Sequence, residues 1–282
     1  MNCGMRIFTL IILITVVACG GMAGVSIAAD NRGHGVPADA LPKELKNVSV
    51  KDYALPGKNK EVGVIQIVLG HVVVARGDLN QAYFAANGDK LYEQDILFSL
   101  KSSKCRIKLL NNDVITLGES TCITVKEVSG SRNAPEKKTN LSITRGKAMF
   151  YALHLLSDKG TTMTVESPTS VASVLGAKFG MEIAKEGERT IEILPLNLAD
   201  SSSDWGGHLL LAKANPPLSI MTTVHGFDGM VTVTSTVDGR TRNVGAGQSV
   251  SASAKGMGAL TPTPPQVSKR FQSATNMPLP PG

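Results

Sequence analysis

Aromatic side chains are scarce in this sequence. Phe, Trp and Tyr make up 4% of the 282 residues, and Trp205 is the single tryptophan. Val, Ile, Thr, Ser and Gly are plentiful, a mixture typical of strands and turns rather than of helices. A chain of this length can bury a substantial core, in one large domain or two small ones.

Long runs of one charge are also missing. The 29 Lys and Arg are interleaved with 23 Asp and Glu, which leaves a formal net charge of +6. Basic residues that are spread out in this way favour solubility and give no basic patch for nucleic acid. We therefore expect no nucleic-acid partner.

Cysteine is rare, with Cys3, Cys19, Cys105 and Cys122 alone. An oxidising compartment would permit a disulfide between Cys105 and Cys122. However, Cys105 alternates in phase with the apolar Ile107, whereas Cys122 is out of phase with Ile123. The two side chains should point to opposite faces, so two separate thiols, one of them packed as a small hydrophobe, are favoured over the disulfide.

Motifs that carry catalysis or bind metals are absent as well. No His-Glu-x-x-His, Cys-x-x-Cys or Gly-x-Ser-x-Gly pattern occurs. The histidines His71 and His225 lie beside glycines at expected strand starts, where a half-exposed structural role is usual. Asp95, Asp113 and Asp228 lie at expected turns, where Asp bonds its own backbone. We expect no catalytic residue, no metal site and no cofactor.

The N-terminus carries the longest apolar run. Residues 7–19 are uncharged and follow Arg6, the layout of a secretory signal. The sequence leaves three processing routes open: cleavage near Ala29, which makes 1–29 a signal peptide; a lipobox that ends at Cys19, which makes 1–18 the signal and Cys19 the lipid-bearing residue; or an uncleaved anchor. Each route predicts a bacterial protein that is periplasmic or membrane-anchored outside the cytoplasm.

The middle of the chain predicts many short strands. Apolar and β-branched residues alternate with polar ones, and Gly, Asn or Asp recurs every eight to twelve residues or so. This pattern indicates an all-β domain, solenoid-like or sandwich-like, over residues 62–255. It is interrupted by an insertion at 195–221, preceded by a tether at 30–60 and followed by a Pro-rich tail at 256–282 that we expect to be disordered.

Gly176 is the most unusual residue of the β pattern. It lies in the strand-like stretch VASVLGAKFG, residues 171–180, and glycine weakens a strand interior. A phosphate-binding loop would need a glycine-rich turn that opens a helix, with Lys and Ser or Thr at fixed offsets. Lys178 instead lies in a run that alternates like a strand, so Gly176 is interpreted as a close backbone approach or a bulge that directs Phe179 into the core.

Taken in their order along the chain, the strand-like segments resemble the FecR-like domain family. The resemblance covers about 62–255 and is carried by the stretches GHVVVARG, LYEQDILFSLKSSKCRIKLLNNDVITLGESTCITV, LSITRGKAMF, VESPTSVASVLGAKFGMEI and GFDGMVTVTSTVDGRTRNVGAGQSV. The chain departs from the family pattern at Ala177, where threonine is usual, at Gln94, where glycine is expected before Asp95, and at Asn112-Asp113, where Asp-Gly is usual.

The resemblance implies an all-β extracytoplasmic domain that binds proteins or envelope components and has no established enzyme activity. It marks as structural positions Gly146, Pro168, Gly176, Phe179, Gly229 and Gly247. Members of the family that sense a receptor pass the signal through a membrane helix to a cytoplasmic segment. Six residues before the apolar run are too few for such a segment, which argues against that route here.

Two functions follow as hypotheses. The first is an exported, non-catalytic module for protein interaction, associated with envelope signalling; the alternative is an envelope-structural or glycan-binding protein. Trp205, in the flexible-looking insertion, is a candidate anchor for a protein or glycan, although a cap on the edge of the core is the favoured interpretation. The membrane is expected to be contacted only through a lipid or an N-terminal anchor.

Overall fold

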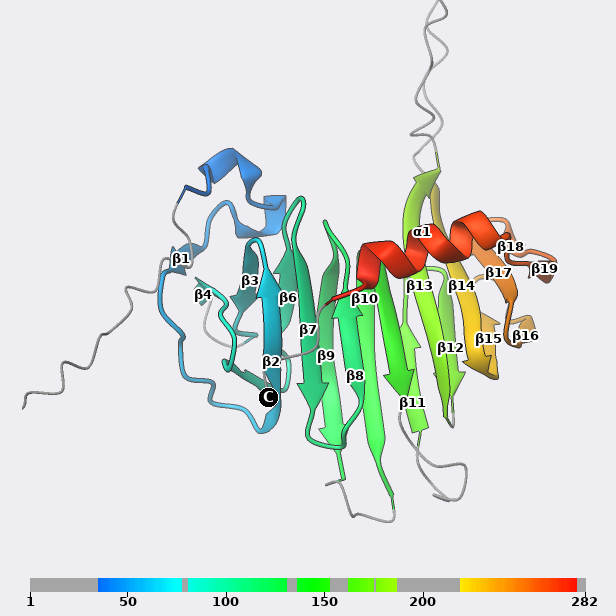
Figure 1. Ribbon diagram of the computed structural model, residues 1–282, viewed down its shortest axis with the longest axis horizontal. Coiled ribbons are helices and arrows are strands. Elements are labelled where there is room, and N and C mark those ends of the chain that lie inside the picture. The colour runs from blue at the N-terminus through cyan, green and yellow to red at the C-terminus, as the bar shows by residue number, and fades with distance from the viewer. Residues whose placement is uncertain are drawn as a thin grey trace, which may run out of the picture. The chain divides into compact units, whose positions relative to one another are not determined.

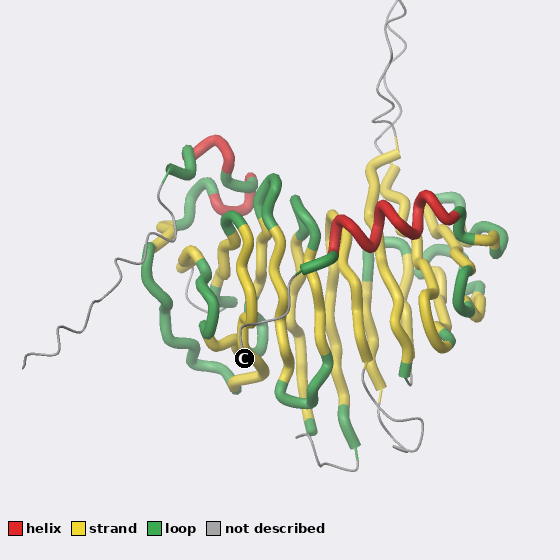
Figure 2. The backbone as a smooth tube through the Cα atoms, viewed as in Figure 1, coloured by secondary structure: helices red, strands yellow, loops and turns green. Residues whose placement is uncertain are grey.

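Strands dominate the part of the chain that the structure describes. The computed structural model describes residues 35–77, 81–130, 136–152, 162–174, 176–186 and 219–277. Helical backbone in these ranges is limited to the early 3-10 helices and the late helix α1 (Pro265–Thr275), which Figure 2 colours red. Within them no helix is long and apolar enough to cross a bilayer. The predicted all-β class is confirmed.

The strands form two sheets. Sheet A contains, in spatial order, β1 (Ser49–Lys51), β4 (Gln81–Phe84), β3 (Val72–Ala75), β6 (Ile96–Ser99), β9 (Cys122–Ser129), β10 (Lys138–Ala152), β11 (Thr162–Glu166), β12 (Ser170–Val174), β15 (Val231–Ser235) and β16 (Thr241–Val244). Sheet B contains β5 (Lys90–Tyr92), β2 (Glu61–Leu69), β7 (Lys104–Leu109), β8 (Val114–Leu117), β10 again, β13 (Ala177–Glu186), β14 (Ser219–Gly229) and β17 (Gln248–Ser253), and the short strands β18 (Gly256–Met257) and β19 (Thr261–Pro262) both pair with β17. The neighbouring order can be followed in Figure 1.

Strand β10 belongs to both sheets. Its first half pairs with β9 and β11 in sheet A, and its second half pairs with β8 and β13 in sheet B. Gly146 stands at the crossover with φ +82°, in the left-handed region, and a Cβ there would lie 2.5 Å from the Cα of Thr121. Any other residue would clash with this backbone, so the glycine permits one strand to join the two sheets.

The core lies between the sheets. A single apolar cluster collects the inward side chains of both, among them Leu97 and Ile123 of sheet A and Ile107 and Phe179 of sheet B. Their alternation with outward residues is the period-2 pattern that the sequence displays. The arrangement is therefore a two-layer, sandwich-like fold.

Residues at 30–60 do not form the simple tether that we predicted. The segment that contains the short helices η1 (Ala38–Ala40) and η2 (Lys43–Leu45) packs on the outer face of sheet A and then forms its edge strand β1. Leu45 is buried there in a second apolar cluster with Phe84, Phe98 and Cys122. The prediction failed because this segment has few apolar residues, and the surface that buries them comes from distant strands.

The predicted disordered tail is also wrong for residues 256–277. After β18 and β19, helix α1 (Pro265–Thr275) lies across the outer face of sheet B, in front of β10 and β13 in Figure 1. Its prolines precede or open the helix, where a missing N–H costs nothing. Phe271 and Thr275, one turn apart, are both buried.

The insertion predicted at 195–221 ends earlier than expected, since β14 begins at Ser219. Residues 195–218 lie outside the described ranges.

Candidate interaction site

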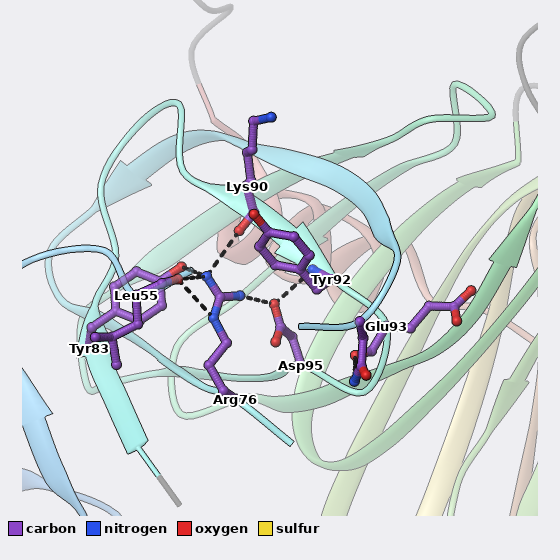
Figure 3. A network of polar contacts seen from close by, with 8 residues as sticks. Leu55, Arg76, Tyr83, Lys90, Tyr92, Glu93 and Asp95 are labelled. Atoms are coloured by element: carbon purple, nitrogen blue, oxygen red, sulfur yellow. Dashed lines mark hydrogen bonds and ion pairs between the residues drawn. The ribbon is translucent and has the colours of Figure 1, made fainter. Parts of the chain in front are cut away.

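A buried ion pair lies at the ends of β3 and β6, two neighbouring strands of sheet A, next to β5 at the edge of sheet B. Arg76 follows β3 and Asp95 precedes β6, and they are 4% and 1% exposed. The Arg76 guanidinium donates to Asp95 Oδ2 and to the carbonyl oxygen of Leu55, and Nη2 lies 3.1 Å from the hydroxyl of Tyr83. It also faces the ring of Tyr92, with Cζ 4.7 Å from the ring centroid (Figure 3).

The surroundings of this pair assign it a structural role. Asp95 Oδ2 also accepts the backbone N–H of Tyr92 at 2.8 Å, so backbone and side-chain donors converge on one carboxylate. The guanidinium is enclosed by aromatic rings and carbonyl oxygens rather than facing an open cavity (Figure 3). A buried pair of this kind is costly to break, because the remaining charge would be left uncompensated. It fixes the loop around Leu55 to the end of β3.

The stretch around Gly176 leads into β13, which pairs with β14. Gly176 immediately precedes β13, and Gly229 ends β14, its antiparallel neighbour. Gly229 has φ +71°, and a Cβ on it would lie 2.6 Å from the carbonyl oxygen of Gly176. The two backbones therefore approach so closely that no side chain fits between them.

An apolar cavity opens at this point. It has a volume of about 620 Å³ and is lined by Gly176, Gly229, Val174 and Met230, with hydroxyl-bearing residues of β11, β12 and β15 beside them. Met230, which lines the cavity, is 59% exposed. No Asp, Glu, His, Lys or Arg is among the described residues that line the cavity. The described lining therefore offers apolar surface and hydroxyl groups.

Phe179 and Gly247 occupy positions that shape the neighbourhood of this site. Phe179 is fully buried and stacks on Phe150 across β13 and β10, with ring centroids 5.0 Å apart. Gly247 has φ +75° in the turn before β17, and its N–H donates to the carbonyl oxygen of Gly226 at 2.9 Å. Pro168 lies in the turn between β11 and β12, and its carbonyl oxygen accepts the hydroxyl of Thr236.

The two described cysteines are free thiols in different clusters. Cys105 is in the core between the sheets, and Cys122 is in the cluster on the outer face of sheet A. Burial raises the pKa of the Cys105 thiol to about 12 and also raises the pKa of Cys122. The structure places them on opposite faces, as the sequence phase predicted, and a thiol with a raised pKa is a poor nucleophile.

His225 is buried, not half-exposed as we predicted. It lies within β14 rather than at its start, is 5% exposed, and packs beneath Phe271 of α1 with ring centroids 5.4 Å apart. Nδ1 has no hydrogen-bond partner among the described residues. Burial lowers its pKa, against a smaller raising effect of the Glu182 carboxylate. The sequence missed this because the covering helix lies far along the chain.

Other sequence predictions are not tested by the geometry. Cys19, Trp205, His34, His154 and His208 lie outside the described residues. Across the described ranges, no group of three or more His, Cys, Asp and Glu side chains could hold a metal ion. Neither the Arg76–Asp95 pair nor the cavity beside Met230 was predicted, because both depend on residues distant in sequence.

The fold and the apolar site define a two-layer β domain with an exposed apolar cavity at its glycine-lined strand ends. Residues 95–194 match the family model described as FecR protein. The match supports, over this segment, the FecR resemblance that the motifs predicted. It begins at Asp95 and includes Gly176, whereas Arg76 and Gly229 lie outside it.

Two crystal structures of a "putative anti-sigma factor" from Parabacteroides distasonis ATCC 8503 are similar to the chain. One has 11% identity and a TM-score of 0.42, covering 62% of this chain and 63% of the other. The second has 13% identity and a TM-score of 0.38, covering 60% of each. The chain thus spans about three fifths of their length, and a likeness at this level says nothing about function. No curated protein matches.

Proposed function

We propose that the chain is an exported, non-catalytic FecR-type module that acts in envelope signalling by binding a protein partner. The observation that carries the proposal is the apolar cavity beside Gly176 and Gly229, with Met230 exposed next to it. Exposed long apolar side chains beside a concavity are typical of protein interaction sites. The family match over 95–194 supports the association with signalling.

The shape of this site favours a partner side chain over a substrate. The approach of Gly176 to Gly229 removes side chains from the cavity wall, and Val174 and Met230 supply apolar surface around it. An apolar side chain from a partner can enter such a cavity and be desolvated, which is how anchor residues contribute to binding. The described lining offers neither a nucleophile–base pair nor paired carboxylates.

A crosslinking experiment in intact cells tests this proposal. A photoreactive amino acid replaces Met230, and the matched control replaces Val237, which is 52% exposed in the turn between β15 and β16. We expect a discrete protein adduct from position 230 and none from position 237. The purified domain should compete for this adduct, and the Met230→Asp domain should not.

Other results would contradict the proposal. Equal labelling from both positions would mean that Met230 marks no specific site. Adducts only with cell-wall glycan would support the envelope-structural alternative instead.

Export is a separate part of the proposal. The mass of the mature N-terminus distinguishes a diacylglyceryl group on Cys19 from cleavage near Ala29 or an uncleaved anchor, and each would support a protein held outside the cytoplasm. An unprocessed chain recovered from the cytoplasm would contradict it.

A further inference from the structure

A groove lies between helix α1 and the outer face of sheet B. It has a volume of about 350 Å³, and its lining includes Met149, Tyr151 and Lys178 from the sheet and Lys269 and Gln272 from α1. The groove is distinct from the apolar cavity beside Met230, since the two share no lining residue.

The charged side chains that are described in the lining of the groove are both positive. Lys178 and Lys269 both line it, and no Asp or Glu is among the described lining residues. Within the described ranges Lys178 forms no ion pair, not even with Asp228, its cross-strand neighbour on β14. Its Nζ lies 5.3 Å from the ring centroid of Tyr151. The ammonium group therefore lies over the Tyr151 ring, beyond ion-pair distance of any described carboxylate.

A further positive charge acts on Tyr151, and neutral donors line the groove. Arg106 of β7 lies close enough to affect Tyr151, and its guanidinium donates to the carbonyl oxygen of Met277 at 2.9 Å. Burial raises the pKa of Tyr151, more than Arg106 lowers it, so its phenol stays protonated at neutral pH. Gln272 contributes an amide, and the buried Met149 provides an apolar floor.

Helix α1 is held over the groove by contacts at its C-terminal end. Lys104 Nζ donates to the carbonyl oxygen of Ser273 at 2.8 Å and reaches that of Asn276 at 3.3 Å. Phe271 packs on Gly180, where a Cβ would lie 2.4 Å from its ring. The residues that line the groove therefore come from the sheet and from a helix that is docked on it.

We propose that this groove binds a small ligand through an oxyanion group, a phosphate or a carboxylate. Lys178 and Lys269 approach the anion from the sheet and from the helix, Tyr151 and Gln272 are neutral donors, and Met149 contacts an apolar part of the ligand. Charge-assisted hydrogen bonds of this type are the stronger ones in proteins. Because the ligand bridges α1 and the sheet, its binding also stabilises the docked helix.

Calorimetric titration of the full-length protein tests the proposal. Inorganic phosphate and citrate are titrated separately at constant ionic strength, and chloride is the reference. We expect saturable binding of at least one anion at millimolar concentration, together with a rise in melting temperature. Binding of phosphate alone would identify a phosphoryl ligand, and binding of citrate alone a carboxylate ligand.

Variants separate a specific site from general charge. Lys178→Gln and Lys269→Gln should each weaken Kd by about tenfold, the loss of one charge-assisted contact. Lys255→Gln, at an exposed turn between β17 and β18, should leave Kd unchanged. Circular dichroism shows whether each variant is folded. Absence of saturable binding by either anion, or an equal loss in the Lys255 variant, would overturn the proposal.

Discussion

Single residues show how the backbone accommodates departures from the sequence pattern of the family that this chain resembles. Gln94 stands where the FecR resemblance predicts glycine, and the structure gives it φ +67°, in the left-handed region. Its side chain donates to the carbonyl oxygen of Lys126 at 2.8 Å. A non-glycine residue in this conformation costs about 1–2 kcal/mol. The side-chain bond offsets part of that cost, which is how glutamine is accommodated here.

Substitution at Gln94 tests this explanation. Gln94→Ala and Gln94→Gly both remove the bond to Lys126, but only alanine keeps a Cβ in the left-handed conformation. We expect the glycine variant to have the larger free energy of unfolding by about 1 kcal/mol, measured by urea denaturation. The control compares Lys108→Ala with Lys108→Gly at an exposed position in β7. There the glycine variant should have the smaller free energy of unfolding, because glycine weakens a strand. If the glycine variant is the more stable one at Lys108 as well as at Gln94, the left-handed backbone of Gln94 is not the source of the difference.

Elements were predictable where the sequence pattern is local. The hairpin of β7 and β8 follows from Ile107 and Ile115, which alternate with polar residues on either side of the Asn111–Asp113 turn. Helix α1 was not predictable in this way, because its prolines suggested disorder and its docking partner, Gly180, lies far upstream. The crossover of β10 at Gly146 likewise depends on the pairing of distant strands. Local patterns determine strands, whereas long-range contacts determine which surfaces the terminal segments cover.

Docking of α1 should depend on Phe271, which is 2% exposed. Phe271→Ala removes the ring that packs on Gly180 and His225. We expect the opening free energy of α1 to fall by about 3 kcal/mol, seen as faster amide hydrogen exchange in 265–275. Val267→Ala is the control, since Val267 is 37% exposed. Unchanged exchange in the Phe271 variant would show that other contacts hold the helix.

The described unit carries a terminal segment on the outer face of each sheet. The segment around η2 covers sheet A, and α1 covers sheet B. The two covers differ in chemistry: the first buries aliphatic side chains such as Leu45, whereas the second encloses the titratable His225. His225 is therefore a source of pH dependence that belongs to sheet B and its helix.

The stability of the domain should fall in mild acid because of His225. Its imidazole is packed between Phe227 and Phe271, Ser249 of β17 is opposite it in the sheet, and Glu182 of β13 is the acidic group that acts on it. Burial lowers its pKa below the ordinary 6.5, so the unfolded chain binds a proton more readily than the folded one.

The free energy of unfolding is therefore greatest above pH 6.5 and decreases as the pH falls from there towards the lowered pKa. Each pKa unit by which folding lowers the His225 pKa contributes about 1.4 kcal/mol to the free energy of unfolding above pH 6.5. Urea denaturation of the wild type and of His225→Gln between pH 8 and pH 5 measures this contribution, because glutamine does not titrate. We expect the variant to have the shallower slope, whatever its absolute stability. If the two slopes coincide over this range, His225 is not the group that links protonation to folding, and the burial assigned to it beneath α1 is wrong.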